Sequence, residues 1–579
     1  MIIVSISIVI CLILISVQSK SHHHSDILQA QFSFDLQDSI TISTDKTHLY
    51  HSSEWVAVSW SGIPQPKPND WIGLYSPANV DVRQTAPIKL KFASSSDDHL
   101  KSGSGTLLFS VLNMRSDLKF VLFRGGVSAP VKVAESKVIS FDNVNEPVSA
   151  HLSITDETPR QLRLSWTSLN TESPSVQYWI DDTKYESRAQ SVSYTREEMC
   201  GPPASGYGWR DPGTIHHALL TGLKPSSSFQ YRYGSDHTGW SHVMTGHVPP
   251  NAGDDYVTFY TFGDLGTASP DGALQPFWTQ PASRKSTDFI SRNVEAADFV
   301  LHIGDISYAV GFQASWDSFF NQIAPISQTL PYQVAIGNHE RDYEHSHGLF
   351  ESDDSGGECG VPYQRQFPIP SGSFNQTWYS MKSGPVHILV MSTEHDFHQG
   401  SDQYTFIEND LKNVNREKTP WVIVAGHRPM YVDTSVDLYG DASEKFVSEM
   451  LRNELEDLLV KYKVELAFWG HDHSYQRSCP VYNENCIKVA ASTDGYLGPI
   501  HLVVGSAGMD LSPDGAKVPP GWLHTRVDDF GIGLVKASKT RILFQFISDK
   551  SEQVLDEILL QKRPNVSSDR VGGVDIAIA

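Results

Sequence analysis

Phe299-Val300-Leu301-His302-Ile303-Gly304-Asp305-Ile306-Ser307-Tyr308 is the stretch that decides the fold. Its apolar half has the composition of a buried strand, and the Gly-Asp pair marks a sharp exit from that strand. In open α/β sheets, ligands bind beyond the carboxyl ends of the strands, which is where Asp305 then lies. His302 stands within the apolar run and is interpreted as a core residue. Alone the stretch is weak evidence for a site, because many strands end in Gly-Asp.

Four further apolar runs end in a similar way. They end at Gly263-Asp264-Leu265-Gly266, Gly337-Asn338-His339-Glu340, Val424-Ala425-Gly426-His427 and Gly470-His471-Asp472-His473. From residue 256 onward, apolar runs alternate with amphipathic segments such as 287–297 and 444–462, which predicts an α/β domain. Parallel strands bring their carboxyl ends together at one edge, so the polar residues should converge. Each block alone is usually a turn, but five in this order are hard to attribute to chance.

The converging side chains are carboxylates, an amide, imidazoles and a phenol. Oxygen and imidazole donors together suit transition metals better than Ca²⁺ or Mg²⁺ alone. The donors are too many for one ion, whereas two ions that share a carboxylate would use them all. Such ion pairs lie ~3.5–4 Å apart and clamp the attacking and leaving oxygens of a phosphoryl displacement.

The first half of the chain has the short alternating runs and turns of β domains. Residues 30–145 predict an all-β sandwich, and residues 146–250 predict a fibronectin-III-like sandwich. The aromatic run at 71–75 is interpreted as core, with a ligand-facing role as the alternative. The expected architecture is therefore two N-terminal β-sandwich domains followed by an α/β domain, whose main part covers 254–499 and whose C-terminal part covers 500–562.

The N-terminus and the cysteines predict a secreted protein. Residues 2–17 are nearly all apolar and precede small residues, so 1–19 is predicted to be a cleaved signal peptide, with an uncleaved anchor as the alternative. No later run is long and apolar enough to span a membrane. The predicted disulfide is Cys479–Cys486, which closes a short loop, and Cys200–Cys359 follows by exclusion. Asn375 and Asn565 head glycosylation sequons.

The charge of the chain limits its partners. The formal net charge is −22, from 45 Lys and Arg against 67 Asp and Glu. Nucleic acids and anionic membranes need a basic face, so neither is expected as a partner. Small phosphorylated substrates would instead be attracted by bound metal cations. A homodimer is left open.

Taken together, the five blocks resemble the calcineurin-like metallophosphoesterases, and within them the large plant-type purple acid phosphatases with an extra N-terminal β domain. The pattern GD-x-G / GD-x-x-Y / GNH-E / x-x-x-H / GH-x-H is intact. Tyr308, in the second block, separates purple acid phosphatases from most relatives. The resemblance covers about residues 150–560. It implies a four-layer domain, in which a β-sandwich is flanked by helices.

The resemblance also implies a site and an activity. It assigns Asp264, Tyr308 and His473 to a ferric ion. It assigns Asn338, His427 and His471 to a divalent zinc, manganese or iron ion. Asp305 would bridge the two ions. The implied enzyme is a secreted acid phosphatase, which hydrolyses phosphate monoesters through a metal-bound hydroxide. The secretory pathway would deliver it outside the cell, with the cell wall and the vacuole as alternative locations. His339 would orient the phosphate or protonate the leaving oxygen, with a bond to Asp305 or to a neighbouring loop as its structural alternative.

The sequence departs from the family pattern in one place. Many plant members carry two histidines shortly after the fourth block, whereas this chain continues as Arg428-Pro429-Met430-Tyr431-Val432-Asp433. The candidates for further substrate contacts are Asn338, Arg341, His395 and Tyr431. A nucleotide pyrophosphatase/phosphodiesterase that uses the same site is the alternative function. A non-catalytic metal- or glycan-binding protein is a further alternative, against which the complete set of ligands argues.

Overall fold

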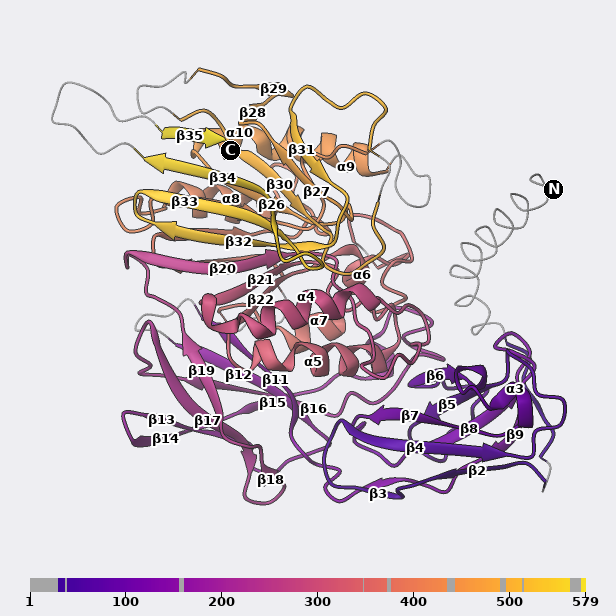
Figure 1. Cartoon of the computed structure of the whole chain (residues 1–579). Coiled ribbons are helices and arrows are strands. Elements are labelled where there is room, and N and C mark those ends of the chain that lie inside the picture. Colours follow the sequence, from indigo (N-terminus) through magenta and orange to yellow (C-terminus); the bar gives the residue numbers. More distant parts are fainter. Residues whose placement is uncertain are drawn as a thin grey trace, which may run out of the picture.

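The computed structural model describes residues 30–36, 39–155, 161–346, 348–371, 376–434, 443–489, 496–512, 515–562 and 574–578. The predicted signal peptide and the sequons at Asn375 and Asn565 lie outside these residues. Two β domains precede an α/β domain (Figure 1), which confirms the predicted fold class. Within the described part, none of the helices has the length and apolar character needed to cross a membrane.

The first β domain is built from two main sheets. One has the strand order β1-β9-β8-β5-β6, the second has the order β2-β4-β7, and β3 pairs with β10. The bounds are β1 Ser33–Phe34, β2 Thr41–Thr44, β3 His48–Leu49, β4 Glu54–Ser61, β5 Trp71–Tyr75, β6 Lys89–Phe92, β7 Gly105–Val111, β8 Lys119–Arg124, β9 Val131–Glu135 and β10 Ser140–Phe141, with the short helix α3 at His99–Ser102. All of β5 is buried, so its aromatic run belongs to the core, as the sequence predicted.

The second β domain is likewise a pair of sheets. Their strand orders are β11-β12-β16-β15 and β14-β13-β17-β18, with β19 also paired to β17. The bounds are β11 Val148–Ile154, β12 Leu162–Ser168, β13 Ser175–Ile180, β14 Thr183–Arg188, β15 Gln190–Val192, β16 Thr214–Leu220, β17 Ser227–Ser235, β18 Gly239–Trp240 and β19 Met244–Val248. The predicted disulfide Cys200–Cys359 is present and ties this domain to the α/β domain. The other predicted disulfide, Cys479–Cys486, is also present.

Two seven-stranded sheets form the centre of the α/β domain. Their orders are β22-β21-β20-β32-β33-β34-β35 and β23-β24-β25-β26-β30-β27-β31. The first sheet has the bounds β20 Tyr256–Phe262, β21 Phe299–Ile303, β22 Tyr332–Ala335, β32 Gly531–Ser538, β33 Arg541–Ser548, β34 Val554–Lys562 and β35 Val574–Ile578. The second has the bounds β23 Tyr379–Ser383, β24 Val386–Val390, β25 Trp421–Ala425, β26 Leu466–Trp469, β27 Tyr475–Ser478, β30 Ile500–Val504 and β31 Leu523–Val527; a separate hairpin pairs β28 Val481–Tyr482 with β29 Asn485–Cys486.

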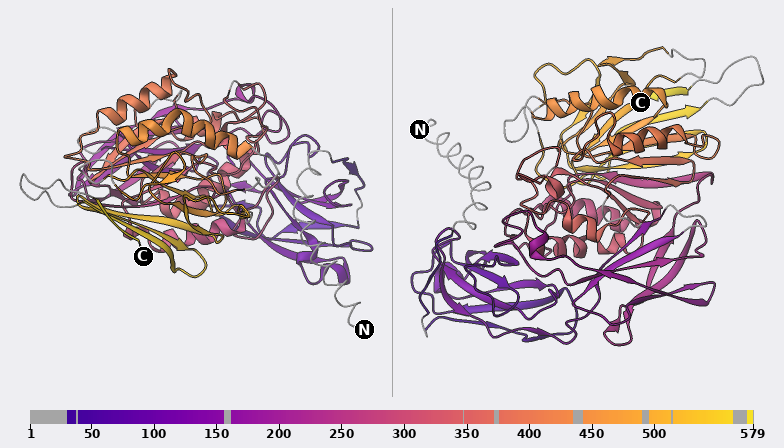
Figure 2. Two further views of the ribbon diagram at one scale, coloured as in Figure 1. Left: turned by 90° about the horizontal axis from the view of Figure 1, so that it is seen from above. Right: turned by 180° about the vertical axis from the view of Figure 1, so that it is seen from behind.

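Helices cover the outer faces of both sheets, which gives four layers (Figures 1 and 2). Residues on β25 alternate between two cores: Ile423 packs toward the other sheet, whereas Val422 and Val424 pack against helices. This alternation has the period of two expected for a strand that is buried on both faces. The helices are α4 Pro281–Arg292, α5 Gln313–Ser327, α6 Asn338–Arg341, α7 Val361–Gln366, α8 Asp402–Lys412, α9 Ser443–Leu451 and α10 Asp457–Lys461, with a π-helical turn at Arg452–Glu456.

Two details differ from the sequence expectation. The amphipathic segment predicted at 287–297 begins earlier, because Pro281 starts α4 and its fixed φ suits the first helical turn. The five polar blocks also do not follow one sheet: three follow β20, β21 and β22, and two follow β25 and β26. The strands in each group are parallel, so both sheets direct their carboxyl ends to the same region. Convergence therefore needs the packing of two sheets, which a local pattern does not specify.

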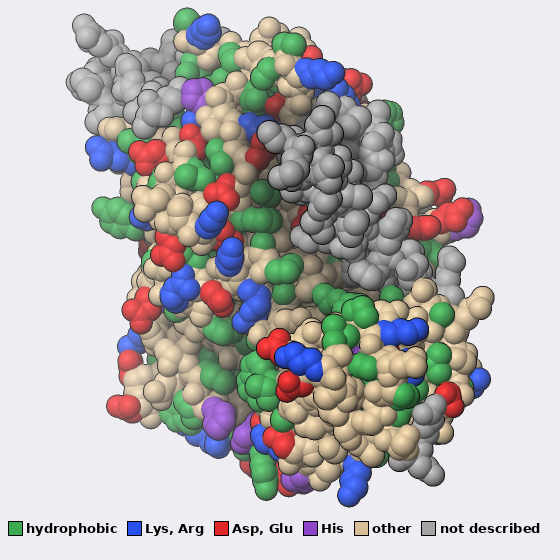
Figure 3. Space-filling model, turned by 45° about the vertical axis from the view of Figure 1, so that its right-hand side comes forward, with side chains coloured by type: hydrophobic (Ala, Val, Ile, Leu, Met, Phe, Trp, Pro, Cys, Tyr) green, Lys and Arg blue, Asp and Glu red, His purple; other side chains and the backbone are tan. Residues whose placement is uncertain are grey.

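The surface carries charges of both signs. On the face shown in Figure 3, Lys and Arg side chains lie among Asp and Glu side chains rather than forming one basic field. This distribution agrees with the acidic net charge of −22. Among the described side chains on that face, no extended basic surface for a phosphate backbone is visible.

A buried histidine between the second β domain and the α/β domain makes stability depend on pH. The His151 ring packs on Phe320 and Phe367, and its Nε2 lies 2.9 Å from the carbonyl oxygen of Gln366. Burial lowers the pKa of His151 from 6.5 to about 4. Between these values the unfolded chain binds the proton that the folded chain does not. Stability is thus lost as the pH falls through this window, by roughly 3 kcal/mol in total.

The His151→Gln variant tests this prediction, because the glutamine amide can still donate to the Gln366 carbonyl. Denaturant unfolding would be measured at about pH 7.5 and about pH 4.5. We expect the parent to lose more stability than the variant over this interval. An equal loss in both proteins would contradict the assignment.

Candidate metal centre

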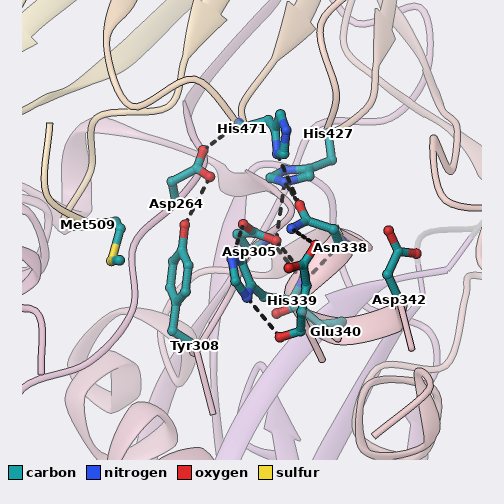
Figure 4. A network of polar contacts seen from close by, with 12 residues as sticks. Asp264, Asp305, Tyr308, Asn338, His339, Glu340, Asp342, His427, His471 and Met509 are labelled. Carbon is teal, nitrogen blue, oxygen red and sulfur yellow. Dashed lines mark hydrogen bonds and ion pairs between the residues drawn. The ribbon is translucent and has the colours of Figure 1, made fainter. Parts of the chain in front are cut away.

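Three of the predicted ligands meet on one side of Asp305, and Figure 4 shows two of them, Asp264 and Tyr308. The Tyr308 hydroxyl lies 3.2 Å from Asp264 Oδ1 and 3.0 Å from His473 Nε2. His473 Nε2 lies 3.5 Å from Asp264 Oδ1. His473 Nδ1 lies 2.8 Å from the carbonyl oxygen of Asp510. That carbonyl holds the hydrogen on Nδ1, so the Nε2 lone pair faces Asp264 and Tyr308, as a metal-binding histidine requires.

Three more predicted ligands meet on the other side of Asp305. Asn338 Oδ1 lies 2.9 Å from His427 Nε2 and 3.0 Å from His471 Nδ1. His427 Nδ1 faces the carbonyl oxygen of Ile303 at 3.0 Å, which again leaves Nε2 toward the cluster. Asp354, which sequence reasoning missed, accepts a hydrogen bond of 2.9 Å from Asn338 Nδ2 and so fixes which end of the amide faces the histidines.

Asp305 lies between the two groups. Its Oδ1 lies 3.2 Å from His427 Nε2, and donor atoms of Asp305, His427 and His471 all come within 4.8 Å of one another. Asp264 connects the groups from the other direction, because its Oδ2 accepts the backbone N–H of His471 at 2.8 Å. The donors are therefore arranged as two neighbouring cation sites with one shared carboxylate would require.

The backbone at these positions adopts a conformation that ordinary residues rarely take. Asp264, Asp305, Tyr308 and His471 have φ of 60°, 49°, 47° and 70°, in the left-handed region. Non-glycine residues there carry strain, which clusters at functional sites. A Cβ on Gly337 would lie 2.2 Å from Asp305 Oδ1, so the glycine of that block allows the two loops to meet.

Glu340 holds the loops that carry the donors together. Its carboxylate accepts backbone hydrogen bonds from Asp305 at 3.0 Å, from Ile306 at 2.8 Å and from Gly337 at 3.0 Å. It therefore joins the loop after β21 to the loop after β22. Its role could have been suspected only from its fixed place after Gly-Asn-His, because no spacing rule predicts these three partners.

The charges of the centre are one test of whether cations fit it. Burial and Arg428 lower the pKa of His471, which favours the neutral ring that a metal ligand needs. Burial would lower the pKa of His427, but the Asp305 carboxylate raises it to about 10. Burial, with Asp305 and Asp264 nearby, raises the pKa of Tyr308 well above its usual value. A strong cation in contact is what would make this phenol a phenolate. The donor set and its charge thus fit two metal ions.

The residues predicted to contact the substrate lie in different places in the structure. His339 lies beside Asp305, with Nε2 3.8 Å from Asp305 Oδ2 and Nδ1 2.9 Å from the carbonyl oxygen of Asp354. Arg341 donates from Nε to His395 Nε2 at 3.3 Å, so these two residues bind each other. The prediction that Tyr431 contacts the substrate is wrong. Its hydroxyl donates to Glu456, and its ring packs on His501 and Trp522.

Tyr431 is therefore buried behind the second sheet and does not reach the centre. Met430 and Tyr431 both belong to the apolar cluster between the second sheet and its helices. The chain after residue 428 therefore packs in that cluster and not at the centre. Sequence proximity to His427 was the only reason to propose it.

Arg428 stands where the sequence departs from the family pattern. Its Nε donates to Glu394 at 2.9 Å and its Nη2 donates to Asp342 at 3.0 Å. Nη1 lies 3.2 Å from Nε2 of the predicted ligand His471. The side chain is only 7 % exposed. A buried guanidinium thus supports the outer side of one predicted cation site, a role that sequence reasoning missed.

Comparisons with known proteins cover almost the whole described chain. Residues 40–143 match the Fn3-like domain from purple acid phosphatase, and residues 147–247 match the purple acid phosphatase N-terminal domain. Residues 257–475 match the calcineurin-like phosphoesterase model, and residues 498–557 match the iron/zinc purple acid phosphatase-like protein C model.

Individual relatives agree with these matches. "Probable inactive purple acid phosphatase 27" of Arabidopsis thaliana is 37 % identical over 88 % of this chain and 87 % of its own. A "Nucleotide pyrophosphatase/phosphodiesterase" of Hordeum vulgare is 34 % identical over 56 % of this chain and 88 % of its own. The structure of purple acid phosphatase PPD1 from yellow lupin seeds has a TM-score of 0.85 at 33 % identity and covers 91 % of this chain and 96 % of its own. The chain belongs to the purple acid phosphatase family.

Proposed function

We propose that this chain is a secreted acid phosphatase that hydrolyses phosphate monoesters at a centre of two metal ions. The observation that carries the proposal is the convergence of the other six predicted donors into two groups on either side of Asp305. Asp264, Tyr308 and His473 would hold Fe³⁺, and Asn338, His427 and His471 would hold Zn²⁺, Mn²⁺ or Fe²⁺. Bound there, the cations would supply charge neutralisation for the phosphate and acidify a water.

His339 is the residue proposed to act on the leaving group. Both of its ring nitrogens face acceptors, Nδ1 the Asp354 carbonyl and Nε2 the Asp305 carboxylate. Nε2 is therefore the atom placed to act as general acid toward the departing oxygen of a phosphate that binds beside Asp305. The His339 side chain is 11 % exposed, so a substrate can reach it.

The word "inactive" in the name of the Arabidopsis relative is not carried over to this chain. The donor set of this chain is complete, which argues against a loss of catalysis here. The alternative activity, on nucleotide pyrophosphate or phosphodiester bonds, is supported by the barley relative and by Arg428 in place of the expected histidines.

Turnover by the secreted, metal-loaded protein tests the proposal. We expect hydrolysis of p-nitrophenyl phosphate at acidic pH to exceed that of bis-p-nitrophenyl phosphate. A preference for the diester or for ADP would favour the alternative activity. No turnover of any of the three, with two metals bound, would contradict the enzyme assignment. Secretion is checked by fusing residues 1–19 to a reporter.

The ferric assignment makes a spectroscopic prediction. If Tyr308 binds Fe³⁺ as a phenolate, the protein should be purple, with a broad charge-transfer band in the visible spectrum. The Tyr308→Phe variant should lose that band because the phenol oxygen is gone. Tyr332→Phe is a matched control, since Tyr332 is also fully buried but bonds to His302. Retention of the band in Tyr308→Phe would contradict the assignment.

A further inference from the structure

One loop carries both a predicted metal ligand and an aromatic ring that the centre does not otherwise use. The loop runs from β20 to α4, over residues 263–280. Asp264 lies at its start and Trp278 near its end. The Trp278 ring lies edge-on to two rings of the centre, 5.7 Å from Tyr308 and 5.4 Å from His339 between centroids.

Trp278 is more exposed than Tyr308, the buried ring of the centre that it contacts. Tyr308 is 1 % exposed, and the His339 side chain is 11 % exposed. Trp278 and His339 are both half-buried, so they are the more exposed rings of this group. The neighbouring Phe277 stacks on the buried Phe312, and this contact anchors the loop to the α/β domain. A large apolar ring is therefore presented next to the residue proposed to protonate the leaving group.

The first β domain holds this loop in place. Leu274 and Leu90 of β6 exchange two backbone hydrogen bonds, each of 2.9 Å. Lys89, from the same strand, donates to Asp271 at 2.8 Å, and the side chains are 6 % and 0 % exposed. Asp271 also accepts the backbone N–H of Ser110 on β7 at 2.8 Å. A domain distant from the metal ligands in sequence thus fixes the approach to them.

We propose, on the basis of the phosphatase activity proposed above, that Trp278 is the contact surface for an aromatic leaving group and that the first β domain positions it. The substrates selected would carry a ring beyond the scissile P–O bond, either a nucleobase or an aryl group. Tryptophan offers a flat apolar face for such rings, and stacking on it tolerates differences between them. A phosphate on a small alkyl alcohol has no ring to place there.

The kinetic test compares substrates within each protein. The quantity is the ratio of kcat/KM for an aryl or nucleoside substrate, phenyl phosphate or AMP, to kcat/KM for glycerol 2-phosphate. We expect Trp278→Leu to lower this ratio about tenfold and Trp278→Phe to restore most of it. The matched control is Trp240→Leu, a half-buried tryptophan on β18 in the second β domain, which should leave the ratio within about twofold of the parent.

A fall in turnover of all three substrates by the same factor would overturn the proposal, because Trp278 would then act only on Tyr308 or His339. A fall for phenyl phosphate but not for AMP would assign the surface to aryl groups, and the reverse would assign it to nucleobases. Either result supports an aromatic contact.

Binding of two unreactive phosphonates separates this inference from the proposed function. Phenylphosphonate and methylphosphonate share the phosphoryl end and differ in the ring. Calorimetry on the metal-loaded full chain should give about tenfold tighter binding of phenylphosphonate, with the preference lost in Trp278→Leu. This preference would hold even in a protein with no turnover, and equal binding of both ligands by the parent would overturn the inference.

The positioning role of the first β domain needs its own variant. Replacing Lys89 with Met together with Asp271 with Leu removes the buried ion pair without leaving a lone charge. We expect the aromatic-to-alkyl ratio to fall in this double variant, because the loop loses the Asp271 side-chain contacts with β6 and β7 and keeps only its other hydrogen bonds, among them the Leu90–Leu274 pair. An unchanged ratio would show that the buried ion pair does not position Trp278 and would overturn this part of the proposal.

Discussion

Asp305→Asn should reduce phosphatase activity by about a thousandfold or more and should lower the metal content of the protein below two ions per chain. Asp305 is the carboxylate that lies between both groups of donors, with Oδ1 3.2 Å from His427 Nε2. Burial would raise the pKa of Asp305, but the charges of His427 and His339 hold it well below its usual value. The asparagine amide of the variant is neutral, so it cannot supply the negative charge that would hold two cations together.

The matched control is Asp298→Asn, just before the opposite end of the same strand. Asp298 pairs with His247 at 2.8 Å and accepts a backbone N–H from Thr258, but it does not contact the centre. This variant should retain both metals and its activity. For both proteins, metal content would be measured by elemental analysis, and activity would be measured as the initial rate on p-nitrophenyl phosphate. Two bound metals with full activity in Asp305→Asn would refute the bridging role.

Arg428→Met should destabilise the protein by about 3–5 kcal/mol and weaken binding of the divalent metal. The substitution leaves two buried carboxylates, Asp342 and Glu394, without the guanidinium that binds them both. It also removes the group that lies 3.2 Å from His471 and limits the movement of that ring. Arg428→Lys should be milder, since it keeps the charge but not the planar fork that reaches two partners.

Arg477→Met distinguishes loss of stability from loss of metal. Arg477 forms a buried pair with Asp556 at 2.6 Å, remote from the predicted ligands. The Arg477→Met variant should have a lower denaturant midpoint and an unchanged metal content, whereas Arg428→Met should lower both quantities. A midpoint for Arg428→Met equal to that of the parent would show that Asp342 and Glu394 do not depend on this arginine.

Long-range contacts explain the residues that the sequence did not reveal. Arg428 was noticed only as a departure from a pattern, because its partners lie 34 and 86 residues away along the chain. Tyr431 was proposed because it follows His427 closely, yet its hydroxyl faces Glu456 on a different element. Trp278 gave no signal, since two adjacent aromatic residues in a loop do not reveal which rings of the fold they will contact.

Local pattern by itself determined which residues of this protein end its buried strands: an apolar run, a glycine and a polar donor are neighbours in sequence, and burial with a sharp exit requires that order. The same local logic gave the β domains and the short disulfide Cys479–Cys486. Only the tertiary structure decided that the five blocks come from two sheets and which donors group on each side of Asp305. It also decided that a distant β domain holds Trp278, because such contacts depend on how whole layers pack and not on any one segment.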